Sequence, residues 1–166
     1  MPFATRTDLL KLTKVDKLAQ LAVPADMPMP EGEILRVALE GGDLNQFTEF
    51  DRDLIALALT NIDQALTDAT AAVVAYGIAE ADANPLIARM TARVAFYMLA
   101  DAQESVSEEL MTSYNAVIKQ LQMHARGEIN LTSSSTDPVI EGDVIEITSN
   151  PSRYIPNGSG ADWDTW

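Results

Sequence analysis

The longest regular pattern of hydrophobic positions in the chain runs through residues 51–79. Apolar side chains recur there at intervals of three and four residues over about six turns, which is the spacing of an amphipathic α-helix. Several of them are alanines, so a neighbouring helix can approach this face closely. Asp63 and Asp68 lie off the face. The apolar face consists of Ile55, Ala58, Ile62, Ala65, Ala69, Ala72 and Tyr76.

Residues 86–100 form a second apolar segment, with only three polar side chains, two of which are Arg89 and Arg93. A helix that is apolar nearly all round is predicted to be central in the fold. Asn84 precedes a proline, which is typical of an N-cap followed by the first helical position. Because a buried charge needs a partner, we expect the two arginines either to pair with acids of the same fold or to cross a subunit boundary.

A further helix is predicted over residues 105–126, where apolar side chains again follow helical spacing. Ser105 and Glu108 have the spacing of a capping box, and Gly127 is well placed to end the helix. His124 lies on the apolar face. A single histidine in such a position is more often a packed residue than a catalytic base.

The N-terminal part is predicted to begin with a helix over residues 5–22, since Thr5 and Asp8 form a capping box ahead of an apolar pattern. The prolines that follow exclude a continuous helix over residues 23–50. A short helix is expected at 34–40 within this Pro-rich loop. The aromatic side chains expected to pin the loop to the core are Phe47 and Phe50.

The composition changes after the last predicted helix. Residues 132–138 are predicted to be a connector, and residues 139–148 a short β-hairpin or an extended arm. Residues 149–166 are rich in Asn, Pro, Gly and Ser and cannot bury themselves within so small a domain. Their aromatic and neighbouring side chains are candidates for contact with another subunit or protein. These candidates are Arg153, Tyr154, Ile155, Trp163 and Trp166.

Together the patterns predict a mainly α fold. Residues 1–131 are expected to form a bundle of about four helices that includes the Pro-rich loop. Residues 132–166 are expected to form a linker, a short β segment and an extended C-terminal arm.

The net charge of −14 over 166 residues is unevenly distributed. Residues 1–23 carry four Lys or Arg and two acids, residues 84–127 are balanced, and residues 128–166 carry seven acids and one arginine. A protein of this charge is poorly suited to hold DNA or an anionic membrane. No segment approaches the ~20 apolar residues that span a bilayer, and no signal-peptide pattern opens the chain. We therefore expect synthesis in a cytoplasm and no membrane partner.

The chain offers little for catalysis. It contains no cysteine, and His124 is its single histidine. Disulfides, thiol nucleophiles and Cys-ligated zinc are therefore excluded, and most histidine-based catalysis is disfavoured. Closely spaced acids such as Asp51 and Asp53 suit the first turn of a helix better than a metal site, and no glycine pattern matches a phosphate-binding loop. We expect no catalytic residue, no metal and no cofactor, and hence no enzyme.

The order of the parts is informative beyond the individual patterns. The sequence contains in turn FATRTDLL, IDQALTDA, NPLIARMTARVAFYML and SYNAVIKQLQMHARGEINL. Over residues 3–131 this order resembles the Mu-like bacteriophage and prophage head–tail connector family, whose members are head-completion or adaptor proteins. The stretch SNPSRYI at residues 149–155 is similar to the end of such proteins.

This resemblance implies a structural virion protein of the neck, made in the bacterial host cytoplasm. Subunits of this family form a ring, typically of twelve copies, below the portal protein, and a downstream neck, stopper or tail protein is the next partner. The double-stranded genome passes through the ring without specific binding. The C-terminal arm would reach the portal or an adjacent subunit, and no catalytic residue is carried over.

Two functional hypotheses follow. In a connector, an acidic lumen would repel DNA phosphates and let the genome slide, so Asp63 and Asp68 on the long helix are candidates for lining the channel. The alternative is a small acidic DNA mimic or regulatory protein that binds a basic partner. That alternative predicts one contiguous face of spaced carboxylates.

Overall fold

The computed structural model describes residues 2–132. This range contains six α-helices, one short 3₁₀ helix (η1) and no strand, so the mainly helical prediction is confirmed within it, and the expected number of about four helices is too low. The predicted hairpin at 139–148 and the predicted arm beyond residue 132 lie outside the described residues. The elements are α1 (Arg6–Leu12), α2 (Val15–Ala22), α3 (Gly32–Leu39), α4 (Glu49–Val74), η1 (Glu80–Asp82), α5 (Pro85–Ala102) and α6 (Glu108–Ala125).

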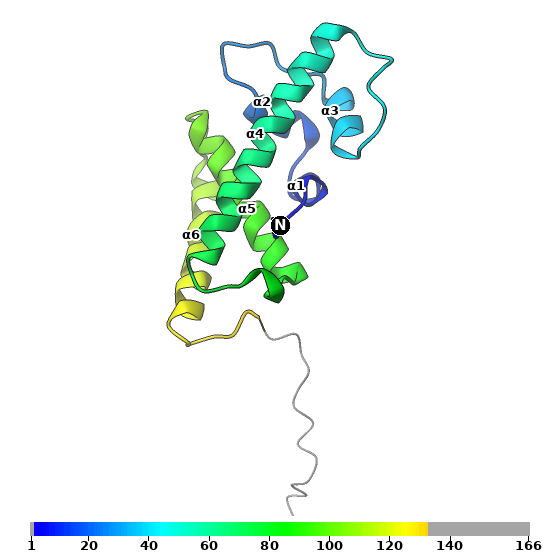
Figure 1. Ribbon diagram of the computed structural model, residues 1–166. Helices are drawn as coiled ribbons and strands as arrows, with labels where there is room; N and C mark the ends of the chain where they lie inside the picture. Colours follow the sequence, from blue (N-terminus) through cyan, green and yellow to red (C-terminus); the bar gives the residue numbers. More distant parts are fainter. Residues whose placement is uncertain (1, 133–166) are drawn as a thin grey trace, which may run out of the picture. The chain divides into compact units, whose positions relative to one another are not determined.

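Helix α5 occupies the centre of this arrangement (Figure 1). It packs most extensively against α4 and also contacts α1, α2 and α6, which is the central position expected from its apolar sequence. The hydroxyl of Thr91 is fully buried in this helix, and it donates a hydrogen bond to the carbonyl oxygen of Ile87 at 2.9 Å. Burial of this polar group is therefore compensated within the helix.

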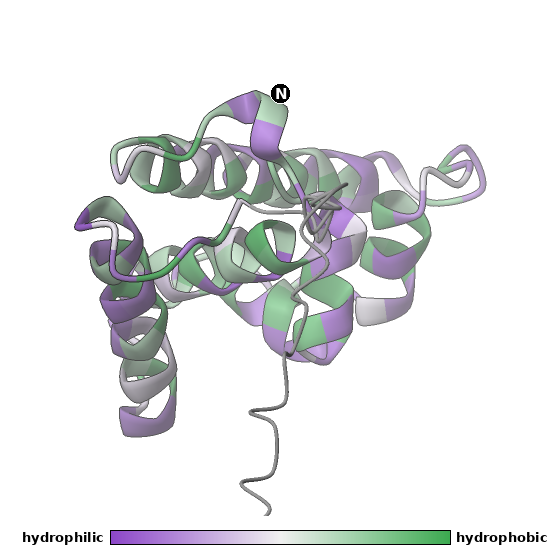
Figure 2. Ribbon diagram, turned by 90° about the horizontal axis from the view of Figure 1, so that it is seen from below, coloured by the Kyte–Doolittle hydropathy of each residue, from purple (hydrophilic) through white to green (hydrophobic). Residues whose placement is uncertain are grey.

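All six α-helices contribute to one hydrophobic core. Figure 2 shows hydrophobic and hydrophilic residues on different sides of the helices, as expected for amphipathic elements around a shared interior. One fully buried residue from each α-helix, in chain order, is Leu9, Leu18, Leu35, Ile62, Ile87 and Leu121.

Helix α4 is the long helix predicted from the hydrophobic pattern, with shifted ends. It begins after Thr48, whose hydroxyl oxygen accepts a hydrogen bond from the backbone N–H of Asp51 at 3.2 Å. It ends at Val74 rather than near residue 79, because the chain turns there and Gly77 has a φ of +90°. A positive φ is incompatible with a continued right-handed helix.

The helix predicted over residues 5–22 is two helices. Thr13 and Lys14 between α1 and α2 have extended backbone conformations, with φ and ψ of −143° and 161° at Thr13. The β-branched side chain of Thr13 favours such a conformation over a helical one. The break lets α1 pack on α5 while α2 packs on α3 and α4.

Two of the predicted helix ends are confirmed and one is wrong. Asn84 caps α5 as expected, and Gly127 follows α6 with a φ of +74°. The N-cap of α6, however, is Ser107 and not Ser105. The backbone N–H of Ser105 instead donates to the carbonyl oxygen of Ala100 at 2.8 Å, so Ser105 belongs to the turn that closes α5.

Of the two aromatic residues expected to pin the Pro-rich loop to the core, one does so and the other does not. Phe47 packs against the core as predicted. Phe50 does not, because its side chain is 63% exposed. It stands in the first turn of α4, ahead of Leu54, which is the first buried residue of that helix.

Candidate interaction site

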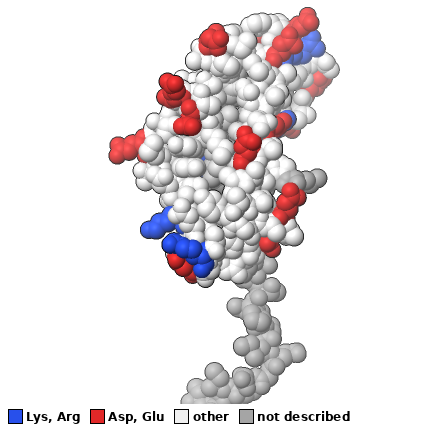
Figure 3. Space-filling view, turned by 60° about the vertical axis from the view of Figure 1, so that its left-hand side comes forward, with Lys and Arg blue, Asp and Glu red and all other residues white. Residues whose placement is uncertain are grey.

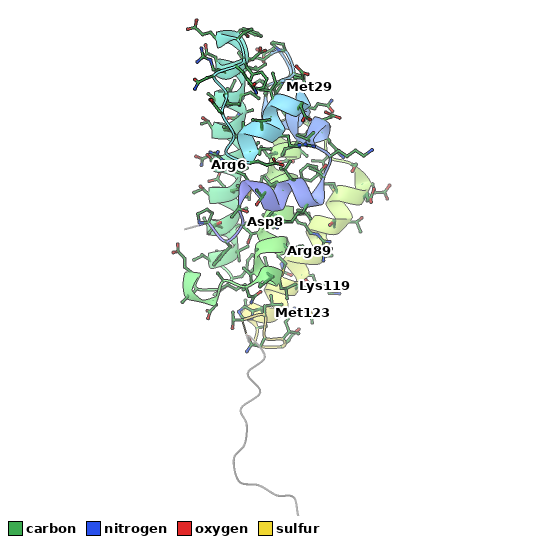
Figure 4. The ribbon with its side chains drawn as sticks, turned by 90° about the vertical axis from the view of Figure 1, so that its right-hand side faces the viewer. Arg6, Asp8, Met29, Arg89, Lys119 and Met123 are labelled. Atoms are coloured by element: carbon green, nitrogen blue, oxygen red, sulfur yellow. The ribbon has the colours of Figure 1, made fainter. Side chains whose placement is uncertain are left out.

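Asp63 forms an ion pair with Arg6 within the protein. Arg6 at the start of α1 donates two hydrogen bonds to the Asp63 carboxylate in the middle of α4, one of them from Nε to Oδ1 at 2.7 Å. The pKa of Arg6 is raised from its ordinary value, chiefly by this hydrogen bond. Figure 4 labels Arg6 and Asp8 on α1. The proposed channel-lining acid Asp63 therefore carries a charge that is already paired.

Asp68 lies on a different side of α4. It is exposed and accepts a hydrogen bond from the Gln64 side-chain amide at 2.9 Å. Five residues separate it from Asp63, so the two side chains point about 140° apart around the helix. The structure thus does not bring these two acids onto one surface.

Arg89 and Arg93 lie on the same side of α5, four residues apart. Arg89 is exposed and Arg93 is half-buried. Neither forms an ion pair within 4.0 Å with any other described residue. Of the two expectations for these arginines, pairing inside the fold is thus not observed in residues 2–132. Figure 4 labels Arg89 of α5 together with Lys119 of α6.

Arg93 lines a groove formed mainly by residues of α1, α5 and α6, with Lys17 of α2 at its side, and we call it the α1–α5–α6 groove. Its volume is about 270 Å³. The side-chain nitrogen of Lys17 stands above the ring of Phe96, 5.6 Å from the ring centre, a distance suited to a cation–π contact. The groove is lined by Leu12, Thr13, Lys17, Arg93, Phe96, Ser107, Glu109, Leu110 and Ser113.

Asn84 and His124 together hold the end of the described chain. The Asn84 side-chain oxygen accepts hydrogen bonds from two backbone N–H groups of α5 at 3.0 Å, and its amide nitrogen donates to the carbonyl oxygen of Leu131 at 2.9 Å. Nδ1 of His124 lies 3.3 Å from the carbonyl oxygen of Ile129 and 3.4 Å from the backbone nitrogen of Leu131. His124 is therefore a packed residue that fixes the chain after α6.

No sequence pattern indicates that Asn84 and His124 both contact the segment after α6. The capping role of Asn84 was predictable from the following proline, but its second contact bridges 47 positions of sequence. The interface residues predicted in the C-terminal part all lie outside the described residues. They are Arg153, Tyr154, Ile155, Trp163 and Trp166.

Other sites are sparse in the described part of the chain. Residues 2–132 contain no group of three or more His, Cys, Asp or Glu side chains positioned to hold a metal ion. No described helix is long and apolar enough to cross a membrane. A further hollow of about 500 Å³ lies beside the Pro-rich loop, where Met27 and Met29 are among its lining residues.

Comparison with known proteins adds a family match. The family described as Bacteriophage Mu, Gp36 matches residues 3–145 of the chain. No curated protein and no solved structure matches.

Proposed function

This chain belongs to the Bacteriophage Mu Gp36 family, and from that premise we propose that it is a structural protein of the phage neck that connects head to tail. In this role it forms a ring, of about twelve copies in the related connectors that its sequence resembles, through which the genome passes. Its partners are further copies of itself, the portal protein and a downstream neck, stopper or tail protein. Double-stranded DNA passes without being bound.

One structural observation carries the proposal beyond the family match. The central helix presents Arg89 and Arg93 without an acid partner in the described fold. Removing a half-buried guanidinium from water is costly unless a carboxylate compensates for it. A neighbouring subunit or the portal can supply that carboxylate in an assembled ring.

The distribution of acids supports a connector over a DNA mimic. On the face drawn in Figure 3, Asp and Glu side chains lie singly or in small groups, with Lys or Arg side chains beside some of them, and they form no continuous acidic surface. A DNA mimic would present a contiguous array that reproduces the regular spacing of phosphates. Asp63 is also neutralised by Arg6, which lowers the number of free carboxylates on α4.

The decisive experiment removes the gene from a phage that encodes this chain. We expect lysates that contain DNA-filled heads and separate tails, and supply of the full chain in trans should restore tailed particles. Electron microscopy of the particles with an antibody to the chain should place it at the neck. Normal yields of tailed, infectious particles without the gene would refute the connector role.

A second measurement distinguishes the connector from the alternative, a DNA mimic that binds a basic partner. The purified chain is mixed with double-stranded DNA and, separately, with a basic DNA-binding protein of the host at physiological salt, where non-specific attraction between opposite charges is screened. A connector of this charge should bind neither tightly. A tight complex with the basic protein that DNA displaces would favour the DNA mimic.

A further inference from the structure

Phe50 is the most exposed large hydrophobic side chain in the described part of the chain, at 63%. Its position is fixed by the cap of α4. The Thr48 hydroxyl oxygen accepts from the Asp51 backbone N–H at 3.2 Å, and the same hydroxyl donates to the Asp51 carboxylate at 2.6 Å. Because Asp51 is engaged in the cap, the exposed carboxylates beside Phe50 are those of Glu49 and Asp53. We call Phe50 with these two acids the Phe50 projection.

The α1–α5–α6 groove has the complementary chemistry. Leu12, Phe96 and Leu110 supply apolar surface, and Lys17 and Arg93 supply positive charge. Glu109 is the single acid among its lining residues. Its volume of about 270 Å³ is smaller than the range of roughly 300–1,000 Å³ typical of small-molecule pockets, and suits one large side chain.

The projection and the groove lie on different parts of the molecule. The projection belongs to the first turn of α4, and no residue of α4 or of the loop before it lines the groove. A contact between two unlike surfaces of one protein is heterologous, and its repetition yields a ring when the rotation closes. The ring of the proposed function requires contacts of this kind.

We propose that the Phe50 projection of one copy docks in the α1–α5–α6 groove of a second copy. The Phe50 ring fills the apolar part of the groove, while Glu49 and Asp53 face Lys17 and Arg93. Aromatic side chains are enriched in the buried centres of protein interfaces, whose rims are polar, and a Phe50 ring in the groove with charged groups around it fits this arrangement. This inference rests on the proposed function, since it assigns the subunit contact of the ring.

Disulfide cross-linking tests the contact directly, because the chain contains no cysteine of its own. A full-length Phe50→Cys chain is mixed with a full-length Ser113→Cys chain under mild oxidation, both at high concentration in solution and during assembly of particles. Ser113 is half-buried at the groove. A disulfide requires the two Cα atoms to approach within about 7 Å, so the mixed dimer reports on proximity.

The matched control replaces Phe50→Cys by Met29→Cys, which is also highly exposed but lies on the Pro-rich loop. We expect several-fold more mixed dimer with Phe50→Cys than with Met29→Cys in at least one of the two conditions. Equal yields in both conditions would overturn the inference. A cross-link of Phe50→Cys exclusively to a different virion protein would also overturn it.

Charge reversal provides an independent measurement that does not depend on cross-linking geometry. Arg93→Glu should weaken self-association of the full chain about tenfold or more, as should Phe50→Ser. Adding Asp53→Arg to Arg93→Glu should recover most of the loss, and adding Asp26→Arg in the Pro-rich loop should not. Failure of Asp53→Arg to rescue any more than Asp26→Arg would contradict the proposed pairing.

The outcomes separate this inference from the function on which it rests. If the chain is located at the neck and the cross-link stays at the control level, the docking contact is wrong and the connector role stands. If the cross-link forms and particles assemble normally without the gene, the contact is right and the connector role is wrong.

Discussion

Glu104 is the one non-glycine residue in the described range with a left-handed backbone, at a φ of 50°. It follows α5, where its N–H donates to the carbonyl oxygen of Asp101 at 3.0 Å. Helices commonly place glycine at this position because a Cβ atom is disfavoured there. Gly127 has the equivalent position after α6. The end of α5 therefore carries a local strain that the end of α6 does not.

Replacing Glu104 by glycine should stabilise the protein. We expect Glu104→Gly to raise the free energy of unfolding by about 0.5–1 kcal/mol, since the left-handed conformation is then unstrained. Urea denaturation followed by circular dichroism measures the change. Gln120→Gly, at an exposed position inside α6, should instead lower the same quantity by about 1 kcal/mol. A destabilised Glu104→Gly variant would show that the strain is compensated by contacts of the Glu104 side chain.

Asp8, in the first turn of α1, makes the stability of the folded state depend on pH. Hydrogen bonds from Lys11 and from the backbone N–H of Thr5 lower the pKa of Asp8 from 3.8 to about 2. A depressed pKa means that the ionised carboxylate stabilises the folded state. This contribution is complete above about pH 5 and is lost progressively as the pH falls from there through the folded-state pKa of about 2.

Asp8→Asn should therefore lower the free energy of unfolding at pH 7 by about 1 kcal/mol, a value reduced for the partial exposure of the pair. The difference from the unmodified chain should shrink as the pH falls from 5 toward 2. Denaturant titrations of both chains across this pH range provide the measurement. Asp26→Asn controls for the loss of one negative charge, and a difference that stays constant down to pH 2 would refute the assignment to Asp8.

At the scale of elements, the sequence predicted what local chemistry determines. The start of α5 at Asn84 and the end of α6 at Gly127 depend on a few neighbouring residues, and both are as predicted. The break at Thr13 depends on packing together with the weak extended preference of one β-branched residue, and the hydrophobic spacing on both sides of it conceals that preference. The exposure of Phe50 depends on how the helices pack, which hydrophobic spacing along one segment does not encode. For the same reason the pairing of Asp63 with Arg6, 57 positions away, could not be read from the chain.

The cap of α5 carries a prediction at this scale. Asn84→Ala removes the cap and also the hydrogen bond to Leu131, so we expect a loss of about 1–2 kcal/mol in the free energy of unfolding. Amide hydrogen exchange in residues 128–132 should become faster as well. Ser107→Ala, which removes only the cap of α6, should cost about 1 kcal/mol and leave that exchange unchanged. Unchanged exchange in Asn84→Ala would mean that His124 alone holds the segment.

At the scale of the whole molecule, the charge divides the chain into unlike parts. Residues 1–23 are slightly basic and residues 128–166 are strongly acidic. Within the described part of the chain, one continuous hydrophobic core extends from Phe3 to Leu131 and includes residues of all six α-helices. Stability and assembly should therefore be separable by truncation.

Deletion of residues 149–166 should leave the helical part folded, with an unchanged helical circular dichroism spectrum and a melting temperature within a few degrees of the full chain. It should impair the joining of heads to tails, because the deleted segment contains Trp163 and Trp166 among the predicted interface residues. Counting tailed particles after complementation with the truncated chain measures the effect. Normal joining by the truncated chain would show that the segment is dispensable for docking.

The double contact of Asn84 has a mechanical consequence. One side chain joins the first turn of α5 to Leu131, in the segment that follows α6. Tension applied to the chain beyond Thr132 would therefore not be borne by the end of α6 alone, because the Asn84 amide passes part of the load to the base of α5. The force would act on the start of α5 and on the end of α6 together. The first interaction to break would be the hydrogen bond between the Asn84 amide and the Leu131 carbonyl oxygen, which can form again when the tension ends.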